Sequence, residues 1–256
     1  NTKSQPVTVD IDIAVKKPCR VRVVVMNPDP NKPNTVYFDR WKDVVDKVSF
    51  EIKMPQNCYR PRLIIGCVGQ QIEGNIEVTK IVRKNLETYP ACANGNGGKE
   101  SKVKEFMKFI QEFSENAAIY GNGSYYSDKR TFRIDYFDVI TEQGKQMTTP
   151  ARIHNDNGRI EAARRYIVPM SVPSRVAVFT HEFSHFNLNV NQHDEIEADL
   201  NALKIYLGYG YPKIEAHKGF LDVFKTYPSN ENRVRYDYLN NFIETFDQEK
   251  FRICLP

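Results

Sequence analysis

Long apolar runs are missing from this sequence, and no segment approaches the roughly 18 consecutive apolar residues that a membrane-spanning helix needs. We therefore expect no membrane span, and the chain shows no signal-peptide pattern that would fix its compartment. An excess of one charge is missing as well, because 36 Lys and Arg residues stand against 32 Asp and Glu residues. The basic residues are scattered, so we expect no nucleic-acid partner.

Cysteine pairs at zinc-site spacing are also absent. The odd number of cysteines leaves at least one outside any disulfide within the chain, and no C-x-x-C pair argues for a cysteine zinc site. One or two disulfides in the first domain stay open, because spacing alone does not determine which cysteines pair. The five are Cys19, Cys58, Cys67, Cys92 and Cys254.

What the sequence does contain is typical of a soluble globular protein. Its 256 residues are 41% apolar and 27% charged, and this length suffices for one large domain or two of ordinary size. The residue pattern changes near residue 90, so we expect two domains, 1–90 and 101–256, with a linker at 91–100. This linker contains Asn94-Gly95-Asn96-Gly97-Gly98 and few apolar residues.

The first domain has the pattern of β-strands. Apolar residues alternate with polar residues in short runs that turn-forming residues separate, which predicts half-buried strands of an all-β sandwich. We find no catalytic group of residues there, and a packing or binding module is the simplest interpretation. The runs are Val7 to Val15, Arg20 to Met26, Thr35 to Phe38, Val48 to Met54, Arg62 to Val68 and Ile76 to Val82.

The second domain has mainly the pattern of helices. Alternation still predicts strands at 131–140 and 166–168. A helix opens at Ser171 with Pro173 in its first turn. Another helix follows Ser101, a suitable N-cap, and its apolar residues recur at helical spacing. These residues are Val103, Phe106, Met107, Ile110 and Phe113.

The helix after Ser171 contains His181-Glu182-Phe183-Ser184-His185, an H-E-x-x-H motif. Residues four apart lie on one face of a helix, so His181 and His185 can bind one metal ion from the same side. Glu182 lies one step round the helix, where its carboxylate can take the proton of a water whose pKa zinc lowers. The motif predicts a catalytic zinc site with Glu182 as general base. A chance match is the alternative, but buried histidines and a buried glutamate are costly without a metal or other partners.

A catalytic zinc ion needs a third protein ligand. The metzincin pattern would place a histidine six residues after His185, where the chain has Asn191, and His193 comes two residues too late. Glu195 is the better candidate, because Asn191 or Asp194 can cap a new helix that begins there.

On this second helix, the acidic residues Glu195, Glu197 and Asp199 do not all lie on the same face. Glu195 and Asp199 share one face, so Asp199 can hydrogen-bond the outer nitrogen of a zinc-bound histidine. Glu197 lies on another face and occupies the capping-box position if Asp194 is the cap.

Together, His181-Glu182-x-x-His185 and Glu195-x-x-Ala198-Asp199 resemble the gluzincin metallopeptidases. The pattern is similar both to the thermolysin type and to HtpX/CAAX-prenyl-protease-like peptidases, although the membrane helices of the latter are absent. The resemblance covers Val176 to Val234. It implies a zincin-like domain in which His181, His185 and Glu195 bind one zinc ion, Glu182 is the general base and Asp199 lies behind a histidine.

A third stretch, 226–234, is similar to the Thr-His-Pro…Arg-Ile segment of HtpX-like peptidases. The resemblance implies that Tyr227 or Arg233 stabilises the oxyanion of the tetrahedral intermediate. Tyr227 stands where that family has histidine. The alternative is that Pro228-Ser229-Asn230 caps the last helix and that Arg233 makes a structural ion pair.

These observations predict an α+β chain, with an all-β sandwich before a zincin-like zinc metallopeptidase domain. The expected substrate is a peptide or protein, which the strand expected at Tyr166-Ile167-Val168 would hold by β-addition. Two rivals stay open. One is a catalytically silent zincin-like structural or binding protein, such as a virion or surface component. In the other, the sandwich carries the main interaction, with a protein or carbohydrate ligand.

Overall fold

The computed structural model describes residues 5–55, 58, 60–68, 74–86, 97–217 and 230–246. It contains both helices and β-sheets, so the chain is of the α+β class. Residue contacts divide the chain into two compact units, an N-terminal unit at Asn1–Thr88 and a C-terminal unit at Tyr89–Pro256. Among the described residues, no helix is long and apolar enough to cross a membrane.

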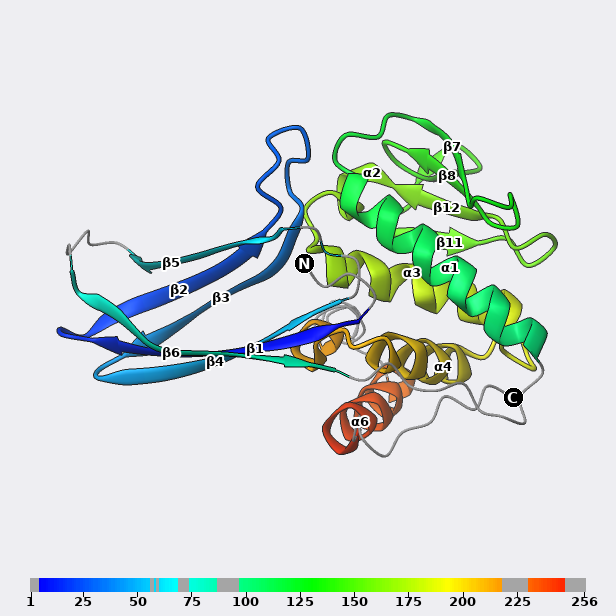
Figure 1. Ribbon diagram of the computed structural model, residues 1–256. Coiled ribbons are helices and arrows are strands. Elements are labelled where there is room, and N and C mark those ends of the chain that lie inside the picture. The colour runs from blue at the N-terminus through cyan, green and yellow to red at the C-terminus, as the bar shows by residue number, and fades with distance from the viewer. Residues whose placement is uncertain are drawn as a thin grey trace. The chain divides into compact units, whose positions relative to one another are not determined.

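The N-terminal unit consists of two three-stranded antiparallel sheets, drawn in blue and cyan in Figure 1. One sheet has the order β4-β1-β6, with β4 at Lys47–Met54, β1 at Val7–Val15 and β6 at Ile76–Asn85. The other has the order β3-β2-β5, with β3 at Val36–Val44, β2 at Cys19–Met26 and β5 at Arg62–Val68. All six expected strands are present, and β3 extends to Val44 rather than ending at Phe38.

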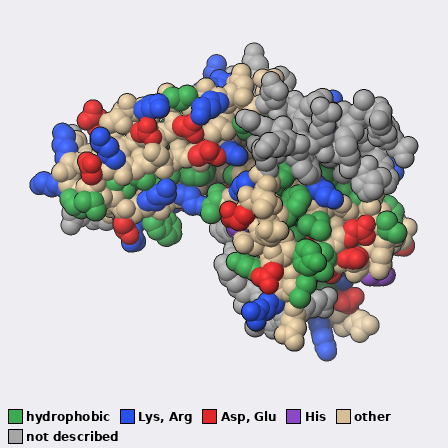
Figure 2. All heavy atoms as spheres, turned by 90° about the horizontal axis from the view of Figure 1, so that it is seen from below, with side chains coloured by type: hydrophobic (Ala, Val, Ile, Leu, Met, Phe, Trp, Pro, Cys, Tyr) green, Lys and Arg blue, Asp and Glu red, His purple; other side chains and the backbone are tan. Residues whose placement is uncertain are grey.

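The core of this unit consists of apolar residues that alternate with more exposed residues along the central strands β1 and β2. The rings of Phe38 in β3 and Phe50 in β4 meet edge to face with centroids 6.4 Å apart, which joins the two sheets. Figure 2 shows acidic and basic side chains interspersed over the surface of the strands, and ion pairs such as Lys84–Asp10 link neighbouring strands. The buried residues of β1 and β2 include Ile11, Ile13, Val15, Val21, Val23 and Val25.

A four-stranded sheet forms one layer of the C-terminal unit. Its order is β11-β12-β8-β7, in which the central β12–β8 pair is parallel and the outer pairs are antiparallel. Strand β11 is therefore an edge strand. The strands are β7 at Gly123–Tyr126, β8 at Arg133–Phe137, β11 at Ala151–Ile153 and β12 at Ile160–Ala163, and a separate hairpin joins β9 at Thr141–Glu142 to β10 at Lys145–Gln146.

Helices α1 at Gly97–Asn116 and α3 at Val172–Asn187 cover one face of this sheet, as Figure 1 shows. Helix α4 at Glu195–Gly208 packs on α3, and α6 at Asn230–Thr245 packs on α4. The short helix α2 at Arg164–Ile167 directly follows β12. Phe106 of α1 stacks on Phe183 of α3 with ring centroids 4.1 Å apart, and Phe113 of α1 meets Phe179 of α3 at 5.4 Å. These contacts place α3, which contains the H-E-x-x-H motif, in the core of the unit.

Two expectations for the C-terminal unit are wrong. Helix α1 begins at Gly97, so residues 97–100 are helical rather than linker, and Ser101 lies inside the helix rather than at its N-cap. Lys99 and Glu100 are good helix formers and extend it. The strand expected at 166–168 is instead the end of α2 and its C-cap Val168, whose N–H donates to the Arg164 carbonyl at 3.0 Å. Three residues are too few for alternation to separate a strand from one helical turn.

Candidate metal centre

Helix α3 begins where the sequence predicts. The Ser171 side chain accepts a hydrogen bond from the Ser174 N–H, and Pro173 lies in the first turn. Phe179 and Phe183 are buried against the core on one side of the helix. The two histidines of the motif therefore project from the other side, towards α4.

His181, His185 and Glu195 form a compact group of ligand atoms. The Nε2 atoms of the two histidines are 3.0 Å apart. The Glu195 carboxylate lies 3.5 Å from each of them, through Oε2 to His181 and through Oε1 to His185. Within the part of the chain that the structure describes, these three residues form the group that can hold a metal ion.

Both histidines are oriented through their outer nitrogens. His185 Nδ1–H donates to the carbonyl oxygen of Gln192 at 2.8 Å, and His181 Nδ1 lies 2.8 Å from Asp199 Oδ1. A carbonyl oxygen only accepts, so the His185 proton is on Nδ1 and its Nε2 lone pair points into the group. This arrangement is typical of metal-binding histidines.

Arg235, from α6, joins the two carboxylates of the site, although the sequence analysis did not select it. Its Nη2 and Nε donate to Asp199 Oδ2 at 2.7 and 3.0 Å, and Nη2 also lies 3.0 Å from Glu195 Oε2. The Asp199 side chain is 3% exposed and that of Arg235 12%. Three helices, α3, α4 and α6, thus meet at the metal group.

Opposite charges in the site stabilise one another, and the two histidines compete for one positive charge. Burial alone lowers the pKa of His181, but the hydrogen bonds to Asp199 and Glu195 raise it to about 10. Burial raises the pKa of Glu195, but the neighbouring His181, His185 and Arg235 bring it down to about 2. Burial and the positive charge of His181 lower the pKa of His185. The carboxylates of Glu195 and Asp199 therefore favour a positive charge between them.

Glu182 lies between α3 and the edge strand β11. Its carboxylate accepts a hydrogen bond from the backbone N–H of Ile153, and burial raises its pKa. A carboxylate with a raised pKa is suited to take up and return a proton.

The loop that leads from α3 to α4 is held by the cap of α4. Asp194 is the N-cap, and its Oδ1 accepts from the Glu197 N–H at 2.9 Å. The predicted capping box is incomplete, because the Asp194 N–H donates to the Asn191 carbonyl instead of to Glu197. The Glu197 carboxylate accepts from the Val190 N–H at 3.1 Å, and so fixes the loop rather than the helix end.

Two other candidates, His193 and Arg233, lie outside the metal group. His193 is exposed, and its backbone N–H donates to the Asn191 side chain. Arg233 is exposed on α6, and the structure brings Arg235 rather than Arg233 to the carboxylates. Tyr227 lies outside the described residues.

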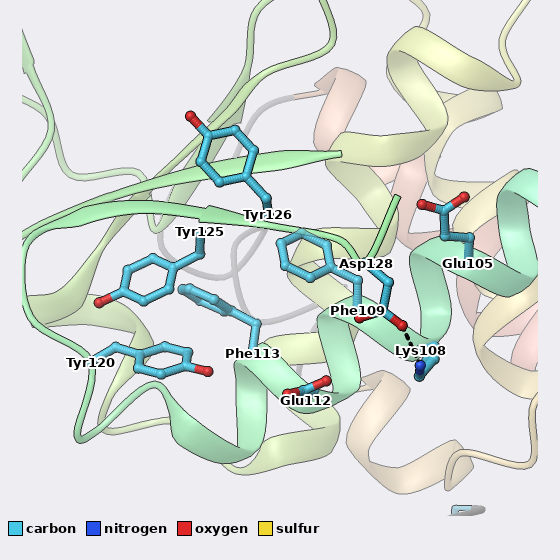
Figure 3. Close-up of a pocket in the computed structure, with 9 residues that line it drawn as sticks. All are labelled: Glu105, Lys108, Phe109, Glu112, Phe113, Tyr120, Tyr125, Tyr126 and Asp128. Carbon is cyan, nitrogen blue, oxygen red and sulfur yellow. Dashed lines mark hydrogen bonds and ion pairs between the residues drawn. The ribbon is translucent and has the colours of Figure 1, made fainter. Parts of the chain in front are cut away.

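A separate pocket of about 100 Å³ lies between α1 and β7 (Figure 3). Tyr120 and Tyr125 stack there with ring centroids 4.2 Å apart, and Lys108 forms an ion pair with Asp128. Its lining contains neither histidine nor cysteine and shares no residue with the metal group. The full lining is Glu105, Lys108, Phe109, Glu112, Phe113, Tyr120, Tyr125, Tyr126 and Asp128.

Comparisons of the chain with protein-family models, with curated proteins and with solved structures give no match. The function must therefore be argued from the geometry and chemistry of the site itself.

Proposed function

We propose that the C-terminal unit is a zinc metallopeptidase of the gluzincin type. The observation that carries the proposal is the convergence of two histidine Nε2 atoms and the Glu195 carboxylate beside the half-buried Glu182. His181, His185 and Glu195 would bind the zinc ion. Asp199 and the Gln192 carbonyl would orient the two imidazoles through their outer nitrogens.

The spacing of the ligand atoms fits zinc. Zinc–nitrogen bonds of about 2.05 Å in a tetrahedral site separate two ligand atoms by about 3.3 Å. The separations in this site, 3.0, 3.5 and 3.5 Å, lie on either side of that value. Two imidazoles and one glutamate are also the ligands of a known class of catalytic zinc site, in which a fourth position stays open.

The residues of the chain then have defined tasks in peptide hydrolysis. Bound zinc supplies Lewis acidity, which polarises a carbonyl and lowers the pKa of a water molecule. Glu182 takes a proton from the attacking water, whose oxygen bonds to the carbonyl carbon. Glu182 then returns that proton to the amine nitrogen as the C–N bond breaks.

Strand β11 is the element that would hold an extended substrate. His154 N–H donates to the Arg159 carbonyl and Ala163 N–H to the Pro150 carbonyl, which fixes the hydrogen-bonded pairs between β11 and β12. Because such pairs alternate, the backbone groups of Ala151 and Ile153 point to the other side of β11. Glu182 hydrogen-bonds that side at Ile153. A peptide added there would pass beside the general base, and β11 replaces residues 166–168 in this role.

The test measures zinc content and peptide cleavage in the same preparations. We expect about one zinc per chain in the wild type and a clear loss in Glu195→Ala, because removal of a ligand lowers metal affinity. Glu182→Gln should keep its zinc and lose turnover of a peptide library by about 10²–10⁴-fold, the usual contribution of a general base. Glu112→Gln, an exposed glutamate of α1, is the matched control and should behave as the wild type.

Other outcomes would select a rival. Zinc in the wild type with no turnover of any peptide would favour the catalytically silent zincin-like protein. Full zinc content in Glu195→Ala would place the third ligand elsewhere, and the absence of zinc from reconstituted wild type would refute the proposal.

A further inference from the structure

Two cysteines lie side by side in the β3-β2-β5 sheet of the N-terminal unit. Cys19 is the first residue of β2, and Cys67 lies near the end of β5. Cys67 is opposite Val21 in the strand register, so Cys19 is its diagonal neighbour on the same face of the sheet. The two Sγ atoms are 2.9 Å apart, and both residues are half-buried.

We propose that Cys19 and Cys67 form an interstrand disulfide bond. The sulfurs need to approach by only about 0.9 Å to reach the S–S bond length of roughly 2.05 Å. The two thiols lose two protons and two electrons as the Sγ–Sγ bond forms. A small disulfide such as oxidised glutathione accepts them, and its own S–S bond breaks to give two thiols.

Asn75, in the segment that leads into β6, hydrogen-bonds both sulfurs. It directly precedes β6 and is 2% exposed. Its side-chain amide N–H groups donate to Cys19 Sγ at 3.3 Å, to Cys67 Sγ at 3.5 Å and to the Lys17 carbonyl at 3.1 Å. Its Oδ1 accepts from the Lys17 N–H at 2.8 Å. Because both the oxygen and the nitrogen of this buried amide are hydrogen-bonded, Asn75 keeps the two sulfurs next to each other.

The place of the pair in the sheet suggests what the bond does. Strand β5 is an edge strand on which Leu63, Ile64 and Val68 are 36%, 43% and 46% exposed. Little apolar burial holds it, and the bond would tie it to the buried central strand β2.

Burial and the neighbouring Cys67 raise the pKa of the Cys19 thiol to about 11. A thiol of high pKa leaves a disulfide slowly, so this bond suits a lasting structural role rather than rapid exchange.

Peptide mapping tests the bond directly. The full chain is equilibrated in a buffer of reduced and oxidised glutathione, alkylated with N-ethylmaleimide under denaturing conditions without reductant, and digested with trypsin. We expect a mass that joins the peptide containing Cys19 to the peptide containing Cys67, and its disappearance after treatment with dithiothreitol. Alkylation of both cysteines, or their attachment to Cys58, Cys92 or Cys254, would overturn the proposal.

Thermal unfolding provides a second readout. Dithiothreitol should lower the Tm of the wild-type N-terminal transition by on the order of 10 °C, because the bond closes a long loop in a small unit. The double variant Cys19→Ser/Cys67→Ser should show no such change. Cys58→Ser, which alters a buried cysteine of the same unit, should respond as the wild type does. An equal response of all three proteins to the reductant would also contradict the bond.

Discussion

The most informative single change at the metal centre is Asp199→Asn. It keeps the size of the side chain and an oxygen that can face His181 Nδ1, 2.8 Å away, but it removes the negative charge. Asp199 is buried, so no water readily takes over the contact. The change therefore isolates what the charge of this carboxylate does for the histidine.

The expected loss in zinc affinity follows from the position of Asp199 behind a ligand. Changes of this kind cost about 10–100-fold in metal affinity, or about 1.4–2.7 kcal/mol. The cost in folding stability should be only about 1–2 kcal/mol, because Arg235 keeps its contact with Glu195 at 3.0 Å. Zinc affinity should therefore fall while the protein stays folded at 25 °C.

The assay is competition for zinc against a chelator at fixed pH, with circular dichroism to verify folding. Asp237→Asn is the matched control, because Asp237 is an exposed aspartate on α6. Zinc affinity of Asp199→Asn within twofold of the wild type would refute the reasoning. An equal loss in Asp237→Asn would show that the effect is not specific to the histidine contact.

Three further substitutions test what stabilises the C-terminal unit around the site. Arg175→Met should lower the stability of the C-terminal unit by about 3 kcal/mol or more in urea unfolding, because this buried arginine donates to three backbone carbonyls that would lose that donor. Asp135→Asn should be less stable than the wild type at neutral pH, and the gap should close below about pH 4. Burial raises the pKa of Asp135, but its hydrogen bonds to two arginines and a serine lower it by more, so the pKa in the folded state lies below its usual value. The carboxylate therefore stabilises the fold above the unfolded pKa near 4, and this stabilisation is lost as the pH falls through the lower folded pKa. Gly158→Ala should cost about 1–3 kcal/mol in thermal unfolding, since φ there is +70° and a Cβ would lie 2.7 Å from the Phe186 ring.

Sequence patterns predicted the parts of the fold in which burial follows a simple period. The nine alternating residues of β1 and the Ser171 cap of α3 are placed where the sequence indicates. The buried apolar residues of α1 from Val103 to Phe113 are those expected from helical spacing. In each case the local preference and the tertiary environment agree.

The strands beside the site were not predictable in the same way. Strand β12 is Ile160-Glu161-Ala162-Ala163, and two alanines and a glutamate have little preference for a strand. Parallel pairing with β8 and antiparallel pairing with β11 impose its conformation. Because β11 is only three residues long, its position next to Glu182 depends on contacts between distant parts of the chain, which a local pattern does not contain.

The position of Arg235 in the site follows from the helical phase of α6. Arg233 was a candidate because residues 226–234 are similar to a family segment. Two residues along a helix correspond to a rotation of about 200°, so Arg233 and Arg235 lie on opposite faces of α6. Arg235 precedes Leu239 by four residues and Ile243 by eight, and both of these are fully buried. Arg235 thus lies on the inward face of α6, where a charged side chain needs a partner of opposite charge. The carboxylates of Glu195 and Asp199 are that partner, so the ion pair that α6 forms in the core also supports the metal group.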